Sequence, residues 1–205
     1  MKKVCTNWAA TFTSDLVSAK YWDEFKQNAT NAAAEIHEVN SWAEAQAKVL
    51  ELIADQKATK ICGVGHEENA EVAKIYETIS GLEGVTLHTD KFEIAEHAEQ
   101  SHVGISCAEF HIAETGSVCV DTKSFEARVT SMLPEMHIVF LNKNHGVNTV
   151  EDAFKVISPV FTSGHMGFIT GPSRTADIER VLTIGVHGPG RFVIIAIDET
   201  NGGAA

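Results

Sequence analysis

The sequence has 205 residues, of which 28 are acidic and 16 are basic, so its formal net charge is −12. A chain of this length forms one large domain or two small ones, and its 44% hydrophobic and 21% charged residues are typical of a globular protein. The negative charge argues against general nucleic-acid binding, because that needs a positive surface facing the phosphates.

The sequence shows neither a membrane span nor a metal site. No apolar run reaches the ~18 residues that a span requires, and the stretch MKKVCTNWAATFTSD has no apolar segment of signal-peptide length. We therefore expect a cytoplasmic protein. The four cysteines form no C-x-x-C pair, and the ten histidines form no H-x-x-x-H pair. These spacings predict no iron–sulfur cluster, zinc or other metal within the chain.

Helices and strands are predicted to alternate through the first half of the chain. Ser41 and Glu44 have the spacing of a capping box, so a helix is expected to begin there. In chain order, the pattern predicts a helix over 15–30, a strand over 34–39, the helix after Ser41, a strand over 60–65, a helix over 67–79, a strand over 85–90 and a helical segment over 91–100.

The second half continues this alternation. It predicts strands over 103–107, 117–121, 137–142, 167–170 and 191–197, helices over 150–157 and about 174–184, and a short helical piece over 108–113. The continuous apolar run FVIIAI is typical of a strand covered on both faces. We expect an α/β fold of three layers, with a mainly parallel sheet and helices on both faces.

No linker or shift in composition divides the chain. We therefore expect a single domain over residues 1–205. It would include an N-terminal helical segment over about 1–33 and a glycine-rich tail over 201–205.

A nucleotide loop is rejected at the first glycine-rich turn. Gly63-Val64-Gly65 follows a strand and precedes a helix, but Glu68 occupies the place of the third glycine of the dinucleotide fingerprint. Glu67 precedes it, and two carboxylates would repel a pyrophosphate. A plain strand–helix turn is the preferred interpretation.

The stretch GPSRTADIE suggests an anion site at a helix N-terminus. Ser173 or Thr175 can cap the helix, but Arg174 opposes the helix dipole unless it helps to hold an anion beside the free backbone N–H groups. With Gly171, these residues would lie where ligands bind in open α/β sheets, outside the carboxyl ends of the strands. The alternative is that Arg174 pairs with Glu179 or another surface acid.

His187, in GVHGPG, enters the last strand at its amino end. It would therefore lie at the opposite edge from Arg174 if the strands are parallel, and a hydrogen-bonded loop residue is the favoured interpretation. The two positions would converge if the last strand were antiparallel.

A third candidate site is the turn Glu114-Thr115-Gly116. Gly116 permits a sharp turn or a close backbone approach. Glu114 at such a turn is a candidate general base, nucleophile or ligand-binding group. The alternative is a capping or salt-bridged carboxylate, with Arg128 as its partner.

Four motifs in order resemble the LUD-domain family, within it the lactate utilisation proteins of type C. They are AETGS (113–117), LPEMHI (133–138), GPSRTADIE (171–179) and GVHGPG (185–190). The resemblance implies a fold similar to that of the NagB, ribose-phosphate isomerase and CoA-transferase superfamily. It also implies a part in the oxidation of L-lactate to pyruvate, beside two partner subunits that carry iron–sulfur clusters.

Three functions follow as hypotheses. The first is a cluster-free subunit or accessory protein of the lactate-oxidising system, which binds a small anion through Thr115, Gly116, Arg128, Gly171, Ser173, Arg174, Thr175 and His187. The second is a stand-alone enzyme similar to CoA-transferases or sugar-phosphate isomerases, with Glu114 as base or nucleophile. The third is a non-catalytic ligand-binding scaffold. A homo-oligomer is compatible with each.

Overall fold

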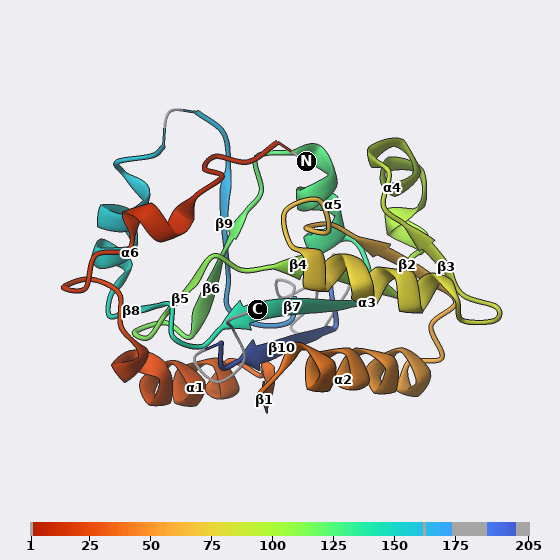
Figure 1. Ribbon diagram of the computed structural model, residues 1–205, viewed down its shortest axis with the longest axis horizontal. Coiled ribbons are helices and arrows are strands. Elements are labelled where there is room, and N and C mark those ends of the chain that lie inside the picture. The colour runs from red at the N-terminus through yellow and green to blue at the C-terminus, as the bar shows by residue number, and fades with distance from the viewer. Residues whose placement is uncertain (1, 162, 174–187, 200–205) are drawn as a thin grey trace, which may run out of the picture.

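The main element of the fold is a six-stranded parallel sheet with the order β1-β10-β7-β4-β2-β3 (Figure 1). The computed structural model describes residues 2–161, 163–173 and 188–199. The strands are β1 (Glu35–Val39), β2 (Lys60–Gly63), β3 (Thr86–His88), β4 (Val103–Cys107), β7 (Met136–Asn142) and β10 (Arg191–Ile197). All five pairings between them are parallel, as expected for the α/β class.

Helices cover both faces of this sheet because successive side chains of each strand point to opposite sides. In β10, Val193 and Ile195 pack with helices α2 (Trp42–Asp55) and α3 (Ala70–Ser80). Phe192, Ile194 and Ala196 face the other way, toward α1 (Trp22–Asn31). The apolar run predicted a doubly covered strand, and this prediction is confirmed.

On that second face, α4 (Lys91–His97) and α5 (Phe125–Met132) cover β2. Helix α5 was not predicted. It begins after Ser124, whose hydroxyl accepts from the backbone N–H of Ala127. Short 3₁₀ turns also form at Trp8–Thr11, Ala19–Tyr21 and Ala98–Gln100.

The chain leaves neighbouring strands β2 and β4 on opposite faces. After β2 it enters α3 on one face, whereas after β4 it passes into a second sheet on the other. Ligands bind at such a switch point in open α/β sheets, because the diverging loops leave a crevice at the carboxyl ends of the strands.

The second sheet has four strands in the order β8-β5-β6-β9. They are β5 (Phe110–Ile112), β6 (Ser117–Asp121), β8 (Gly146–Val147) and β9 (Met166–Ile169), beside helix α6 (Val150–Ile157). The predicted helical piece over 108–113 is wrong. All three residues of β5 are buried, and they pair with β6 and β8, which a helix would prevent.

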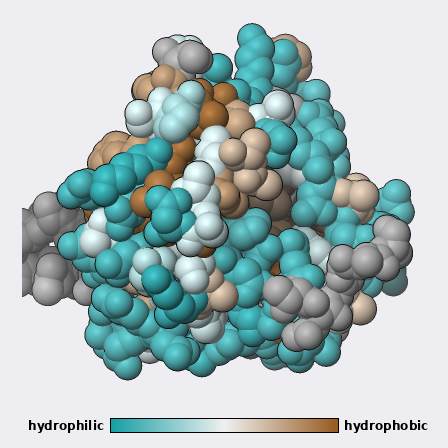
Figure 2. Space-filling model, turned by 60° about the vertical axis from the view of Figure 1, so that its left-hand side comes forward, coloured by the Kyte–Doolittle hydropathy of each residue, from teal (hydrophilic) through white to brown (hydrophobic). Residues whose placement is uncertain are grey.

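Apolar side chains remain exposed beside the second sheet. More than a third of the surface is exposed in each of three residues: Phe154 on α6, Phe168 on β9, and Phe161 between these two elements. Figure 2 shows apolar surface gathered in the upper part of the face that it brings forward. In the described part of the chain, no helix is long and apolar enough to cross a membrane.

Candidate functional site at the carboxyl edge of the sheet

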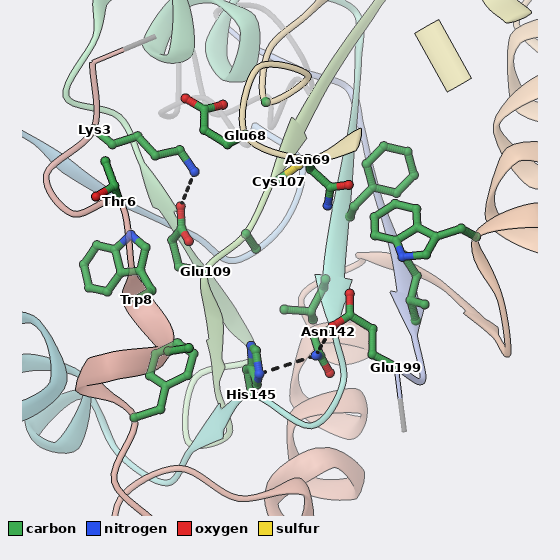
Figure 3. Close-up of a pocket in the computed structure, with 18 residues that line it drawn as sticks. Lys3, Thr6, Trp8, Glu68, Asn69, Cys107, Glu109, Asn142, His145 and Glu199 are labelled. Atoms are coloured by element: carbon green, nitrogen blue, oxygen red, sulfur yellow. Dashed lines mark hydrogen bonds and ion pairs between the residues drawn. The ribbon is translucent and has the colours of Figure 1, made fainter. Parts of the chain in front are cut away.

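A cavity of about 240 Å³ lies at the switch point, and we call it the carboxyl-edge pocket. Its floor comes from the ends of β4, β7 and β10, at Cys107, Asn142 and Ile197. One wall is the loop before α3, with Glu68 and Asn69, and the opposite wall is the N-terminal arm, which we define as residues 2–12 (Figure 3). The pocket therefore joins segments from both ends of the chain.

The N-terminal arm is fixed to the second sheet by polar and aromatic contacts. The backbone N–H groups of Val4 and Cys5 donate to Oδ2 of Asp121, at 2.6 and 3.4 Å, and Asp121 is almost fully buried at the end of β6. Farther along, the ring of Phe12 packs edge-on against Phe110, with 6.1 Å between centroids. These contacts place the side chains of Lys3, Thr6 and Trp8 over the pocket (Figure 3).

Glu109 and Lys3 form the ionic centre of the pocket. Nζ of Lys3 donates to Oε1 of Glu109 at 3.0 Å, and only 12% of either side chain is exposed. Burial raises the pKa of Glu109 to about 7, although the ammonium of Lys3 opposes the shift. Such a carboxyl group can gain or lose a proton near neutral pH, which is the property that acid–base chemistry or proton-linked binding needs.

Two other titratable groups in the pocket are held neutral. Burial raises the pKa of the Cys107 thiol to about 12, so this cysteine is a poor nucleophile. Burial also lowers the pKa of His145. His145 Nε2 lies 3.4 Å from Nδ2 of Asn142, which donates to Glu199 at 2.7 Å (Figure 3). Asn142 and His145 thus offer neutral polar groups to a ligand.

Gly65 allows the loop before α3 to approach the floor of the pocket. Its φ is +95°, and a Cβ there would lie 2.9 Å from Sγ of Cys107. The interpretation of GVG as a plain turn is compatible with this geometry, and Glu68 in the same loop lines the pocket. Among the described residues, no group of three or more His, Cys, Asp or Glu side chains is arranged to hold a metal ion.

Three of the predicted ligand-binding residues line a different cavity of about 560 Å³: Arg128, Gly171 and Ser173. Its other walls include Ser131 and Met132 of α5, residues of β9, and Gly188 and Pro189, which precede β10. Nη1 of Arg128 donates to the carbonyls of Thr122 and Lys123, at 2.9 and 3.0 Å, so in the described structure it pairs with backbone rather than with Glu114.

The prediction that the turn before Arg174 lies at the carboxyl edge of the main sheet is wrong. The backbone N–H of Ser173 donates to the carbonyl of Pro189 at 2.7 Å, so this turn lies at the amino end of β10. The reason is that β9 pairs antiparallel with β6 in the second sheet and is not a neighbour of β10. Arg174, Thr175, His187 and the predicted helix over 174–184 lie outside the described residues.

The predicted turn at residues 114–116 is away from both cavities. Oε2 of the exposed Glu114 accepts from the backbone N–H of Val150, the first residue of α6. Oγ1 of Thr115 donates to Ser117 at 2.8 Å. Gly116 has φ +66°, and a Cβ there would lie 2.2 Å from the backbone nitrogen of Ala29. These contacts are structural, and the ligand and catalytic roles proposed for the turn stay predictions.

Sequence reasoning missed the three residues that define the carboxyl-edge pocket. Glu109 comes two residues after β4, and the rule that sites lie at carboxyl ends of parallel strands would have found it. Lys3 and Trp8 carry no comparable signal, because their positions depend on the contacts of the N-terminal arm with Asp121 and Phe110.

Comparison with known proteins gives the family description "LUD domain" over residues 22–197. Three similar curated proteins are each named lactate utilization protein C. The one from Halalkalibacterium halodurans is 33% identical over 55% of this chain and 51% of its own length. Those from Geobacillus sp. WCH70 and Bacillus licheniformis are 35% and 31% identical over 51% and 52% of this chain, and 45% and 47% of their own lengths. The chain thus matches about half the length of these relatives.

A solved structure has a similar fold. It is the crystal structure of a DUF162 family protein from Deinococcus radiodurans, with a TM-score of 0.60 at 17% identity. The alignment covers 87% of this chain and 97% of that one. This likeness concerns the fold alone.

Proposed function

The chain belongs to the LUD-domain family, and we propose that it serves lactate utilisation as a subunit or accessory protein that binds a small anion. The names of its relatives support the pathway, although each match covers about half of the relative. The observation that carries the binding role is the carboxyl-edge pocket, where Lys3 and Glu109 meet at the switch point of the sheet.

The proposed partners are subunits that carry iron–sulfur clusters, because oxidation of lactate to pyruvate needs an acceptor for two electrons. The chain has no C-x-x-C pair, so its contribution would be to bind and orient a small molecule rather than to hold a cluster. In this role the protein acts in the cytoplasm.

Lactate oxidation in extracts provides the test. In cells grown on L-lactate, deletion of this chain is expected to abolish lactate-dependent pyruvate formation, and adding back the purified chain should restore it. The chain alone should form no pyruvate. Full activity in the deletion extract, or turnover by the chain alone, would contradict the proposed role.

A second candidate function rests on Glu109. A carboxyl group with a pKa near 7 beside a pocket suits general acid–base catalysis in a stand-alone enzyme similar to CoA-transferases or sugar-phosphate isomerases. Screening the purified chain with acyl-CoA and sugar-phosphate substrates tests it. Turnover lost in Glu109→Gln would favour this candidate over the subunit role.

A further inference from the structure

We propose that the N-terminal arm completes a site for a small monocarboxylate, in which Lys3 moves from Glu109 to the ligand's carboxylate while Glu109 takes up a proton. The inference rests on the proposed function and specifies its ligand and its chemistry. The arm precedes residues 22–197, the part of the chain that the family description matches. The family match therefore does not cover the arm, and the role proposed for the arm rests on the contacts that the arm makes in this structure.

The charges of the pocket favour a single negative charge on the ligand. Lys3 is the one Lys or Arg among the described residues that line the pocket, whereas Glu68, Glu109 and Glu199 are acidic. An anion that takes Lys3 leaves the buried carboxylate of Glu109 without a partner, and burying an unpaired charge is costly. Protonation of Glu109 removes that cost. A dianion would bring a second charge that no described lining residue neutralises.

Trp8 supplies an independent observation that points to a ligand. Its indole nitrogen is buried and has no hydrogen-bond partner among the described residues, although Trp8 lines the pocket and is only 6% exposed. Figure 3 shows that nitrogen on the side of Thr6 and of the Lys3–Glu109 pair. A buried donor without an acceptor costs free energy. A carboxylate that draws Lys3 away would bring an acceptor next to this donor.

The walls of the pocket set the size and polarity of the ligand. Phe12, Trp42 and Phe140 are apolar, and the volume of about 240 Å³ suits a molecule of a few carbon atoms. Asn142 and His145, on the floor, present neutral groups to a hydroxyl or keto oxygen. The ligand class is therefore a small hydroxy- or oxo-monocarboxylate.

The expected pH dependence follows from the groups around Glu109. Burial and the negative charges of Asp121 and Glu68 raise the pKa of Glu109 to about 7, while Lys3 lowers it. The thiol of Cys107 is neutral, and His145 is held neutral by burial. Above pH 7, one proton must therefore be taken up for each anion bound. The Kd is expected to rise about tenfold from pH 6 to pH 8.

Isothermal titration calorimetry of the full chain with L-lactate and pyruvate tests the proposal. Repeating it in buffers of different ionisation enthalpy measures the protons exchanged. Uptake of close to one proton per anion at pH 8 is expected, and no binding of uncharged methyl lactate. Absence of binding at millimolar lactate and pyruvate, or no proton uptake, would overturn the proposal. Either result would still be compatible with the proposed part in lactate utilisation if the deletion extract fails to oxidise lactate.

Variants test the separate contributions of Lys3, Glu109 and Trp8 to binding. Lys3→Met should abolish binding, whereas Lys57→Met, at an exposed position outside the arm and the pocket, should not change the Kd. Glu109→Gln should bind with a Kd that is independent of pH and without proton uptake. Trp8→Phe keeps the aromatic packing and should weaken binding about tenfold. Lys3→Arg keeps the positive charge and is expected to retain binding, so it provides a second test if Lys3→Met does not fold. Wild-type affinity in a folded Lys3→Met protein would overturn the proposal.

Discussion

Val4 and Asp121 are 117 residues apart in sequence, and the backbone N–H of Val4 donates to Oδ2 of Asp121 at 2.6 Å. The same carboxylate oxygen accepts from Cys5, and Oδ1 accepts from the backbone N–H of Lys123. One buried side chain thus ties the N-terminal arm to the end of β6. The position of Lys3 over the carboxyl-edge pocket depends on this attachment.

Removing the Asp121 carboxylate should loosen the arm. In Asp121→Ala the N–H groups of Val4 and Cys5 lose their acceptor, and we expect the free energy of unfolding to fall by about 1–3 kcal/mol. Urea denaturation measures the change. Asp15→Ala, at an exposed position, is the control and should unfold at the same urea concentration as wild type. Equal stability of the two variants would show that Asp121 does not hold the arm.

Gly116 should tolerate no side chain. In Gly116→Ala the new Cβ would lie 2.2 Å from the backbone nitrogen of Ala29 at a φ of +66°, so α1 must shift. We expect a loss of about 2–4 kcal/mol, measured by thermal or urea unfolding. Gly84→Ala is the matched control. Its φ is +76°, and no atom of the described residues lies within 4 Å of the new Cβ, so it should cost only about 1 kcal/mol of backbone strain.

Glu109 should make stability depend on pH. Its pKa is about 7 in the folded protein against an ordinary 4.5, so the folded state binds more protons than the unfolded state between these values. The free energy of unfolding therefore decreases as pH rises from about 5 to 7. Glu109→Gln lacks this contribution and should gain about 1–3 kcal/mol relative to wild type across the same window.

The measurement is urea unfolding of both proteins at several pH values. The attraction between Lys3 and the Glu109 carboxylate is already part of the folded-state pKa of Glu109, because the wild-type carboxyl group is protonated well below pH 7. The stability difference between the two proteins should therefore change as pH rises from about 5 to 7. Parallel curves for the two proteins would show that Glu109 ionises normally.

Glu114 should act on α6 through its hydrogen bond to Val150. Glu114→Ala removes the acceptor at the N-terminus of the helix and should cost about 1 kcal/mol, whereas Glu114→Gln keeps an acceptor oxygen and should cost less. Thermal unfolding compares the two. A Glu114→Gln variant that folds normally but fails to restore lactate oxidation in the deletion extract would instead support the catalytic role.

Local patterns in the sequence determined the strands of the main sheet and most helices. The apolar run of β10 and the capping box at Ser41 depend on neighbouring residues only, and both form. The hydroxyl of Ser41 accepts from the N–H of Glu44 at 3.2 Å, although the carboxylate of Glu44 accepts from Asn40 rather than from Ser41. The family motifs also lie within single segments, so the sequence was enough to identify the family.

Only the tertiary structure decided where the site lies. Short strands such as β5 and β8 are stabilised by partners far along the chain, and their own few residues carry no clear period. Because β9 pairs with β6 in the second sheet, Ser173 lies at the amino end of β10 and not at the carboxyl edge of the main sheet. The pairing of Lys3 with Glu109, 106 residues away, required both Asp121 and the switch point of the sheet. Such contacts between distant segments leave no periodic pattern in the sequence.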